Sequence, residues 1–546
     1  MLKRANFSEF NVAIYGAAAV TLIATPIWNK DALIVPKVIL LFLIGLYLLP
    51  SILKSLNILK SNKLISAFFL ICILTLIQLI LVVFTSDSPI EQQIYGRTGR
   101  GLGFTTLVSL IVISLVVLIY IQSAGLNLIN AVLTFCGVFI AGYGISQSYG
   151  FDFFGWVSKT NGVVATLGNP NFVSSFIAMT VVPTLVFLSY KKNGFIYQIL
   201  TGFFLFFGLY RAQSTQGFLT LCISLSFFAL MFFWFKRKSV FISLAVLGLV
   251  ISIIAVMGML NQGPLSSYLY KVSVQSRGDF WRSAITTINS HPMFGVGLDS
   301  FGDYYLKYRD EVAVSHSFQE FTDSSHNYFL DYAVNGGILL SILFLLTILI
   351  SSLSYLKLQK TKEFNPQITA LFTVLLVYIS QSIISPMNIS LMVWGAVISG
   401  ALVGLTKTQE IEPKTLTKKR KPIEFLGARL AIVILGSAII YPYFNVDKLQ
   451  LRAMQTGNGN LVIEVTKKFP ESTVRYSNIT RELLNSGLPV QALDLAYHAV
   501  KFNPNSPALW ALILINQSAP IEERKKAQIE ILKLDPLNVE VKDYFN

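Results

Sequence analysis

Blocks of about twenty apolar residues recur along most of the chain and constrain its fold more than any other feature. A helix of that length crosses the hydrocarbon core of a bilayer, and in lipid a helix satisfies its own backbone hydrogen bonds. The chain is 53% hydrophobic and only 13% charged. We therefore predict an all-α, polytopic transmembrane helical bundle with about 12–13 spans. The apolar blocks lie near residues 11–29, 34–53, 64–84, 104–123, 128–147, 171–190, 195–210, 215–235, 239–260, 333–356, 367–385, 388–406 and 425–443.

Lysine and arginine are concentrated in alternate loops, which sets the expected orientation. The positive-inside rule places these loops and the N-terminus in the cytoplasm. It also accounts for the net charge of +15 without a nucleic-acid partner. We expect a multi-pass protein of the inner (cytoplasmic) membrane, with residues 1–445 as its membrane domain. The basic loops contain Lys3, Arg4, Lys54, Lys60, Lys63, Lys191, Lys192, Lys236, Arg237, Lys238, Lys357, Lys360, Lys362 and the run from Lys414 to Lys421.

The first apolar block resembles a signal sequence, but no clear A-x-A cleavage site follows it and further blocks come at once, so we expect a retained first span. The long segments between spans then all face the periplasm. They are 85–103, 148–170 and the large loop 261–332, which we expect to carry the chemistry.

After the last apolar block the composition becomes that of a soluble helical domain, residues 446–546, here called the C-terminal tail. Pro470, Pro504 and Pro536 follow helical patterns at intervals of 34 and 32 residues. A period near 34 with paired helices is typical of tetratricopeptide repeats. The tail could bind a partner or acceptor, or could cap the membrane domain. His498 is expected to pack inside the array.

Several arginines lie on the predicted outer face, where the topology rule disfavours positive charge. The candidates among them are Arg97, Arg100, Arg211, Arg277 and Arg282. The planar guanidinium is always charged and suits phosphate oxygens, so a cluster could bind a lipid diphosphate. The alternative is that they anchor loops, by pairing with lipid phosphates or with nearby acids. Those acids are Asp87, Glu91 and Asp279.

The large loop contains an amphipathic helical pattern, "SRGDFWRSAITTI". Arg277 and Trp281 stand four residues apart, and Ile285 and Ile288 continue the same face. We expect this helix to lie against the membrane surface with Trp281 as an interface anchor. It should end at "SHPMFGVGLDSFG", where proline stops a helix and the glycines make a turn.

His326 lies just before the block 333–356, where a lipid-linked substrate could reach it. Its reference pKa near 6.5 allows it to accept a proton from a hydroxyl at neutral pH. Asp323 or Asp331 could orient the ring; alternatively, a loop carbonyl satisfies it. His316 and His291 are weaker candidates.

Asn169 and Asn171 flank Pro170 before the block 171–190. Asn171 could cap the helix, or both amides could bind sugar hydroxyls. The chain has no D-x-D, Walker A, H-E-x-x-H or G-x-S-x-G motif.

Five elements in order resemble the O-antigen ligase and O-antigen polymerase (Wzy-type) membrane proteins over roughly residues 80–350. They are "IYGRTGRGLG", "ATLGNPNF", "QSTQGFLTL", "SRGDFW…HPMFGVGLDSF" and "SSHNYFLDYAVNGG". The resemblance implies a glycosyltransferase of lipopolysaccharide or polysaccharide biosynthesis. Such an enzyme transfers a glycan from undecaprenyl diphosphate to an acceptor hydroxyl on the outer face, without a metal or other cofactor. The acceptor would be lipid A-core, a protein or another glycan.

By position, the resemblance implies that Arg277 holds the diphosphate and that His326 activates the acceptor hydroxyl. Gln216 stands where the family commonly has an arginine, and Arg211, five residues earlier, could replace that charge. An arginine that precedes the G-N-P-N element in the family is also missing here. A ligase is the first hypothesis and a polymerase the second. A lipid-linked glycan flippase, from another class, would need polar residues along a path through the spans, whereas here they gather on one face.

Overall fold

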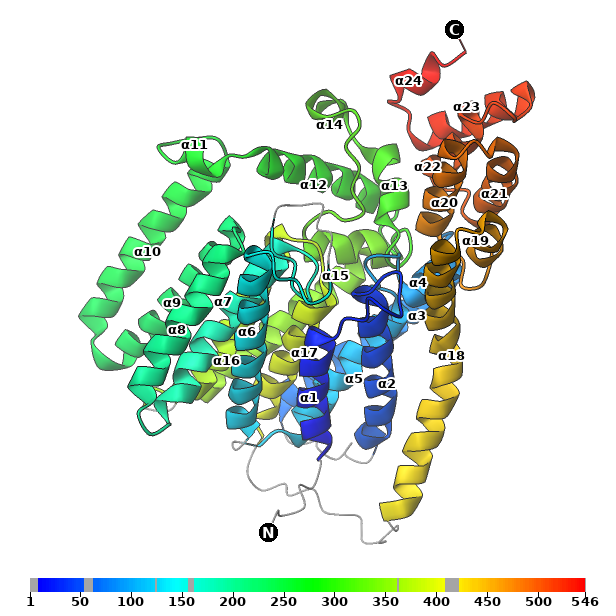
Figure 1. The fold of residues 1–546 in the computed structure, drawn as a ribbon. Helices are drawn as coiled ribbons and strands as arrows, with labels where there is room; N and C mark the ends of the chain where they lie inside the picture. Colours follow the sequence, from blue (N-terminus) through cyan, green and yellow to red (C-terminus); the bar gives the residue numbers. More distant parts are fainter. Residues whose placement is uncertain are drawn as a thin grey trace.

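Helices make up all the regular structure in the part of the chain that the computed structural model describes (Figure 1). That part comprises residues 8–53, 62–122, 125–155, 162–360, 363–407 and 422–545. The predicted all-α class is confirmed.

Among the described residues, ten helices are long and apolar enough to cross a membrane, and three shorter apolar helices accompany them. Together they correspond one to one with the predicted blocks, so the polytopic bundle is confirmed. The long helices are α2 (Ile34–Leu53), α3 (Lys63–Thr85), α6 (Gly125–Ser148), α7 (Pro170–Ser189), α8 (Gly194–Arg211), α9 (Thr215–Lys236), α10 (Lys238–Met259), α15 (Tyr328–Leu358), α16 (Pro366–Ile384) and α18 (Pro422–Thr456). The shorter ones are α1 (Glu9–Leu22), α5 (Phe104–Tyr120) and α17 (Ile389–Gly404).

Three boundaries differ from the expected ones by five residues or more. Helix α1 ends at Leu22 rather than 29 because Ile23 is already extended. Helix α15 begins five residues earlier than 333, since the side chain of Asn327 caps it by accepting from the amides of Phe329 and Leu330. Helix α18 continues past 443 to Thr456 and joins the membrane domain to the tail.

Helix α15 is broken at Gly337, where the backbone has φ 82°. The turn 291–298 of the large loop fills the break, with Ile338 N donating to the Pro292 carbonyl and Val296 N donating to the Val334 carbonyl. A Cβ at Gly337 would lie 2.0 Å from the Met293 carbonyl oxygen, so only glycine fits there. The loop is therefore fixed to the helix that begins beside His326.

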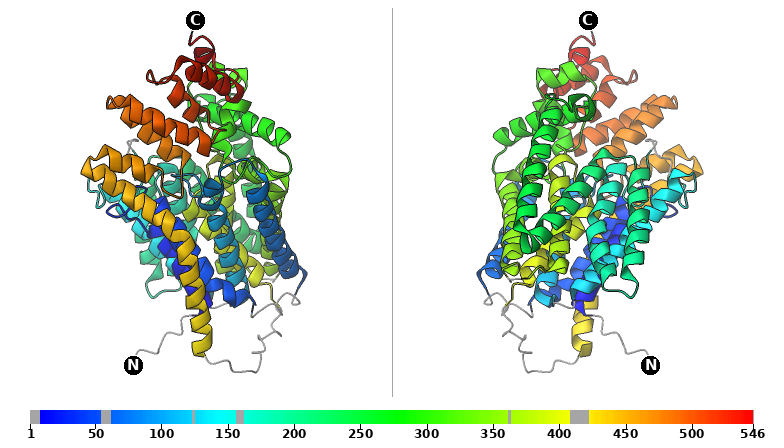
Figure 2. Two further views of the ribbon diagram at one scale, coloured as in Figure 1. Left: turned by 90° about the vertical axis from the view of Figure 1, so that its right-hand side faces the viewer. Right: turned by 90° about the vertical axis from the view of Figure 1, so that its left-hand side faces the viewer.

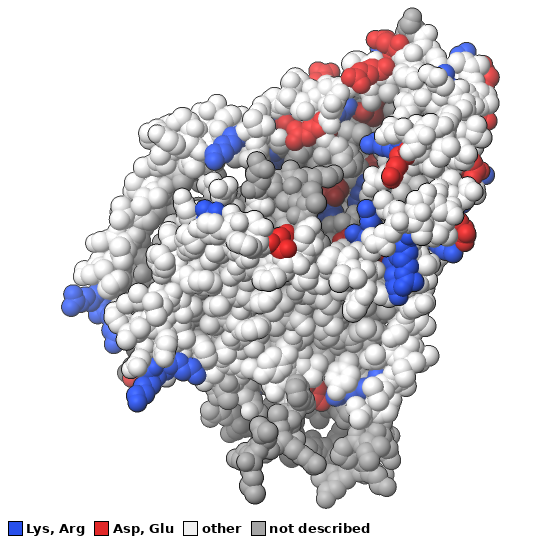
Figure 3. Space-filling model, in the orientation of Figure 1, with Lys and Arg blue, Asp and Glu red and all other residues white. Residues whose placement is uncertain are grey.

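One end of the bundle carries nearly all the irregular polar structure (Figure 1). The short helices α4 (Ile90–Tyr95), α11 (Ser266–Leu269), α13 (Phe301–Tyr308) and α14 (Glu311–His316) gather there, and α12 (Val272–Ser290) lies across the ends of the membrane helices. Helix α12 confirms the predicted amphipathic helix and stops just before the predicted turn. Figure 3 shows charged side chains above and below a broad uncharged belt, as expected for a multi-pass membrane protein.

The C-terminal tail folds onto this end of the molecule. Figure 2 shows α18 running along the outside of the bundle and leading into the tail helices. These are α19 (Gly459–Thr466), α20 (Thr473–Asn485), α21 (Pro489–Phe502), α22 (Pro507–Leu514), α23 (Ile521–Leu534) and α24 (Val539–Lys542). The buried ion pair between Arg309 and Asp535, 2.9 Å apart, ties the tail to the large loop.

Each of the three spaced prolines in the tail follows a helix, namely α19, α21 or α23, as the sequence predicts. Their assignment to tetratricopeptide repeats remains a prediction. The expectation for His498 was wrong: its side chain is exposed, because the buried face of α21 is formed by its apolar neighbours, including Ala496 and Ala499.

Candidate functional site

Arg277 projects from α12 onto the C-terminal end of α16. Its Nε donates to the Ile384 carbonyl at 2.8 Å, and one terminal nitrogen donates to the Ser273 carbonyl at 2.6 Å. Within the described residues, Arg277 forms no ion pair. Burial lowers the pKa of this guanidinium, yet arginine remains charged at any relevant pH. The site therefore contains a positioned positive charge that no carboxylate neutralises.

Gln216 reaches the same end of α16 from the first turn of α9. Its amide Nε2 donates to Ser385 Oγ and to Gln381 Oε1, both at 2.6 Å. Ser385 follows directly after Ile384, so Gln216 and Arg277 hold adjacent residues of one turn. The position where the family commonly has an arginine is thus brought beside the large-loop arginine.

The His326 ring is held in one tautomer by a backbone carbonyl. Its Nδ1 lies 3.2 Å from the Ser324 carbonyl oxygen. Because a carbonyl only accepts, Nδ1 carries the hydrogen, and the lone pair of the neutral ring is on Nε2. The backbone of His326 has φ 58°, a left-handed conformation that is uncommon for a residue other than glycine and is found at functional sites.

Neither predicted carboxylate contacts the ring directly. Asp331 instead accepts from the hydroxyl of Ser324 and from the amide and hydroxyl of Ser325, so it fixes the loop that carries His326. The carbonyl contact proposed as the alternative is the observed one. It does not exclude a role in proton transfer, because it leaves Nε2 as the acceptor.

Several charges act on His326. Burial lowers its pKa below 6.5, and the positive charges of Arg277 and Arg100 lower it further. The Ser324 hydrogen bond and the charge of Asp331 act in the opposite direction without reversing the shift. The ring is therefore neutral at pH 7 and able to accept a proton. It packs 5.2 Å from the ring of Phe280, one helical turn after Arg277.

Arg97 and Arg100 have a different environment, which we call the carboxylate cluster. Arg97 pairs with Asp303 at 3.0 Å, and Arg100 pairs with Asp323 at 2.9 Å and with Asp299 at 3.4 Å. Two guanidinium groups thus face three carboxylates, and the cluster has no surplus positive charge for a diphosphate. It fixes the loop between α4 and α5 to the large loop, which favours the anchoring alternative for these two arginines.

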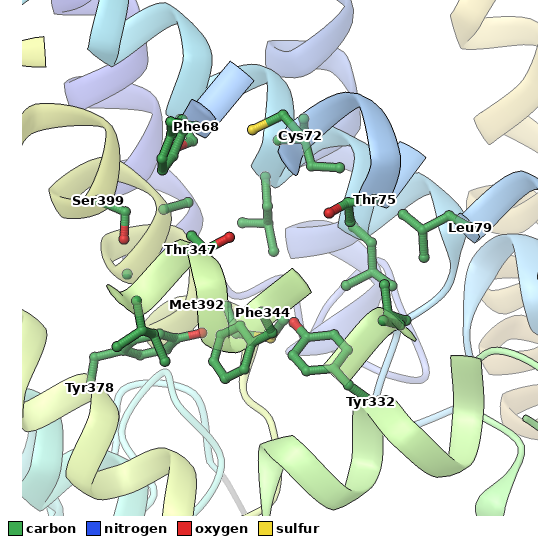
Figure 4. Close-up of a pocket in the computed structure, with 18 residues that line it drawn as sticks. Phe68, Cys72, Thr75, Leu79, Tyr332, Phe344, Thr347, Tyr378, Met392 and Ser399 are labelled. Carbon is green, nitrogen blue, oxygen red and sulfur yellow. The ribbon is translucent and has the colours of Figure 1, made fainter. Parts of the chain in front are cut away.

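Three cavities follow one another beside these residues. The outer cavity, about 600 Å³, lies between the bundle and the tail; Arg100, Asp323 and Met387 are among its lining residues. These three also line a polar pocket of about 20 Å³. That pocket shares Tyr332 with an apolar pocket of about 110 Å³ among the membrane helices. Figure 4 shows Tyr332 at one end of this apolar pocket.

The segment that supplies most of this geometry matches a known family. Residues 200–345 match the family model described as O-antigen ligase. The chain contains an O-antigen ligase domain. The match covers Gln216, Arg277 and His326, and supports a glycosyltransferase-type enzyme acting within a membrane. No curated protein matches the chain.

Arg282 and Trp281 of the O-antigen ligase domain are turned to other contacts. Arg282 pairs with Asp279 at 2.6 Å and with Asp310 at 2.5 Å, so it also joins α12 to the loop. Trp281 is half-buried, and its indole N–H is buried without a hydrogen-bond partner among the described residues. Its role as an interface anchor remains a prediction.

Arg211 binds the end of α6 rather than the turn held by Arg277. It donates to the hydroxyl and carbonyl of Ser148 at 2.8 and 2.9 Å and lies 4.6 Å from the ring centre of Tyr149. No contact in the described structure joins Arg211 to Arg277. The replacement of the family arginine by Arg211 therefore remains a prediction without a supporting contact.

The two asparagines at the start of α7 differ from the expectation that Asn171 caps the helix. Asn169, not Asn171, caps the helix, because its side chain accepts from the Asn171 amide and Pro170 occupies the first helical position. Asn171 accepts from Ser214 Oγ at 2.7 Å, which links α7 to the start of α9. Asn169 also lines the outer cavity.

The other two histidine candidates are engaged elsewhere. His316 Nδ1 lies 3.0 Å from Asp279, and His291 Nε2 lies 3.1 Å from the Tyr308 hydroxyl. Within the described residues, no group of three His, Cys, Asp or Glu side chains is placed to hold a metal ion.

Sequence reasoning missed several residues around the O-antigen ligase domain. The buried Lys37 of α2 donates to the Thr166 carbonyl at 2.5 Å and to Ser390 Oγ at 2.8 Å, which fixes the segment before Asn169. From sequence, a lysine near the end of an apolar block is expected to lie at the membrane–water interface. Only the tertiary structure shows that Lys37 is buried. Asp299 and Asp303 could be suspected only as acids beside the turn 291–298.

Proposed function

We propose that this protein transfers a glycan from undecaprenyl diphosphate to an acceptor hydroxyl at the outer face of the membrane. One observation carries the proposal: the fixed His326 ring packs against Phe280 of α12, one helical turn from Arg277. Arg277 forms no ion pair within the described residues. An oriented base and an unneutralised cation are what this displacement needs, because one accepts the hydroxyl proton while the other stabilises charge on the departing diphosphate.

The reaction forms a bond between the acceptor oxygen and the anomeric carbon and breaks the bond from that carbon to the diphosphate oxygen. His326 Nε2 receives the proton of the hydroxyl as the oxygen attacks. Arg277 stabilises the negative charge that remains with undecaprenyl diphosphate, and Gln216 holds the turn that Arg277 binds by donating to Ser385 and Gln381. Diphosphate is a good leaving group, so positioning and charge stabilisation supply most of the barrier reduction.

The arrangement of cavities supports a lipid-linked donor. The apolar pocket is surrounded by membrane helices and suits hydrocarbon, while the outer cavity is lined by charged and amide side chains. A substrate with a polyprenyl chain and a saccharide needs both kinds of environment. The orientation that places α12 and the tail on the periplasmic side remains part of the proposal.

Transfer assays on His326→Ala and Arg277→Ala test the mechanism directly. The full chain would be reconstituted in liposomes with lipid-linked glycan and acceptor extracted from the host. We expect His326→Ala to lower the rate by about 10²–10⁴-fold, the usual contribution of a general base. His498→Ala is the matched control, since that histidine is exposed on the tail. Near-normal transfer by His326→Ala would remove it from the mechanism.

Orientation can be tested by labelling single cysteines with a membrane-impermeant maleimide in intact cells. A cysteine at the exposed Val312 of the large loop should be labelled, and one at Lys238 should not. Labelling only at Lys238 would place the large loop in the cytoplasm and end the proposal.

A gel of surface polysaccharide from a deletion strain separates the two acceptor classes. Loss of the whole ladder indicates a ligase, whose acceptor is lipid A-core, a protein or another surface molecule. Collapse to a single repeat indicates a polymerase, whose acceptor is a second lipid-linked glycan.

A further inference from the structure

The outer cavity is bounded on one side by the C-terminal tail. Its lining includes Gln450 of α18 and Val474, Arg475 and Asn478 of α20, in addition to residues of the bundle and the large loop. Figure 3 shows the surface hollowed between the tail and the rest of the outer face, with charged side chains in the hollow. The tail is therefore not separate from the space next to the O-antigen ligase domain.

The wall formed by the tail is held rigidly. The hydroxyls of Thr98 and Ser472 are 2.8 Å apart at the rim of the cavity. Deeper in the interface, Asn503 Nδ2 donates to Asp303 at 3.0 Å. With the buried pair of Arg309 and Asp535, these contacts fix α20 relative to the large loop. A wall fixed in this way can contribute specific hydrogen bonds to a ligand.

The polar groups of the cavity wall suit a saccharide. The side chains of Gln450 and Asn478 line the cavity and form no hydrogen bond within the described structure. The guanidinium of Arg475 is held by the carbonyls of Thr466, Lys468 and Pro470 and forms no ion pair among the described side chains. Amides and a fixed guanidinium offer donors and acceptors to hydroxyl groups, and about 300–1,000 Å³ is the usual size of a ligand site.

The opposite wall leads to the proposed catalytic residues. Asp323, whose side chain is 36% exposed, lines the outer cavity and lies three residues before His326. Arg100 lines the same wall and contributes to the electrostatic environment of His326. A saccharide in the outer cavity therefore contacts the loop that carries the base.

We propose that the outer cavity binds saccharide units of the transferred glycan or of its acceptor, and that α18 and α20 of the tail help to select them. This rests on the proposed transferase function. It assigns the tail a direct part in substrate recognition, whereas the sequence suggested only a docking surface or a cap.

The experiment measures binding, so its outcome does not depend on transfer. The full chain in lipid nanodiscs would be probed by saturation-transfer NMR with two saccharide preparations from the host. One is the glycan released from its lipid diphosphate by mild acid, and the other is the saccharide released from the acceptor. Whichever preparation binds identifies the source of the ligand.

Variants then locate the site. We expect Asn478→Ala and Gln450→Ala each to weaken binding by about 2–10-fold, the range for one hydrogen bond, and Val474→Trp to abolish it by filling the cavity. Asn485→Ala is the matched control, an exposed asparagine on the same helix that does not line the cavity.

The inference is overturned if neither saccharide binds the wild type, or if Val474→Trp binds as well as Asn485→Ala. His326→Ala should retain saccharide binding while losing transfer. A failure of the catalytic proposal would show in His326→Ala alone, and a failure of the saccharide site would show in the cavity variants alone.

Discussion

The carboxylate cluster and the region around Arg277 contain the same residue type on the same face of the molecule, yet their electrostatics are opposite. Arg97 and Arg100 face three carboxylates at ion-pair distance, whereas Arg277 is held by two backbone carbonyls. A carbonyl orients a guanidinium without cancelling its charge. The comparison supports the proposal that the uncompensated charge of Arg277 acts in transfer, while the paired arginines hold the loops around it.

The largest effect is expected from breaking the carboxylate cluster. Arg97→Leu leaves Asp303 buried, with a side chain 2% exposed, and without its counter-charge. Removing one partner of a buried pair costs about 3–5 kcal/mol, so thermal unfolding and the amount of folded protein should fall strongly. The double variant Arg97→Leu/Asp303→Leu should recover part of this loss. A normally stable Arg97→Leu protein that fails in transfer would instead move Arg97 into the substrate site.

Arg277→Ala should have a smaller effect in free energy. We expect this effect on the rate of transfer rather than on the stability of the fold. Losing one charge-stabilising donor typically costs about 10²–10³-fold in rate. The melting temperature should change little, because no buried carboxylate loses a partner. Arg277→Lys keeps the charge but loses the planar fork, so it should recover part of the activity. If Arg277→Ala were strongly destabilised while its folded fraction kept a normal rate, Arg277 would be a structural residue like Arg97 and Arg100. The two regions would then not differ in function.

The pH dependence of transfer tests the coupling between Arg277 and His326. The folded-state pKa of His326 is lowered, so the neutral ring persists as pH falls through 6.5, and activity should decline only below that value. In Arg277→Gln, the loss of a nearby positive charge should raise the pKa and move the acid limb of the residual activity to higher pH. In Asp331→Asn the limb should move to lower pH. A profile that is unchanged in both variants would separate His326 from the rate-determining proton transfer.

The smallest effect is expected from Arg211→Gln. This arginine has no carboxylate partner within the described structure but binds Ser148 and Tyr149, with no contact to the Arg277 turn. We expect the rate of transfer to fall by no more than about threefold, as for the loss of one partly exposed hydrogen bond. A loss comparable to that of Arg277→Ala in a folded protein would show that Arg211 replaces the family arginine at Gln216.

The positions of the apolar helices could be predicted from the sequence alone, because they depend on local properties. Runs of apolar residues need no tertiary partner to become helices in lipid, and so α2 was predicted to the residue. The candidate base and the large-loop arginine were also found in sequence, since both are polar residues next to the ends of apolar blocks.

Only the tertiary structure decided which polar residues are neutralised. Arg97 meets Asp303 across 206 residues of chain, and Arg309 meets Asp535 across 226. No local pattern specifies such partners, because they are set by how distant loops pack over the bundle. The same packing places the tail along the outer cavity and leaves Arg277 without a counter-charge among the described residues. This is the physical difference between an anchoring arginine and one that we propose holds an anion.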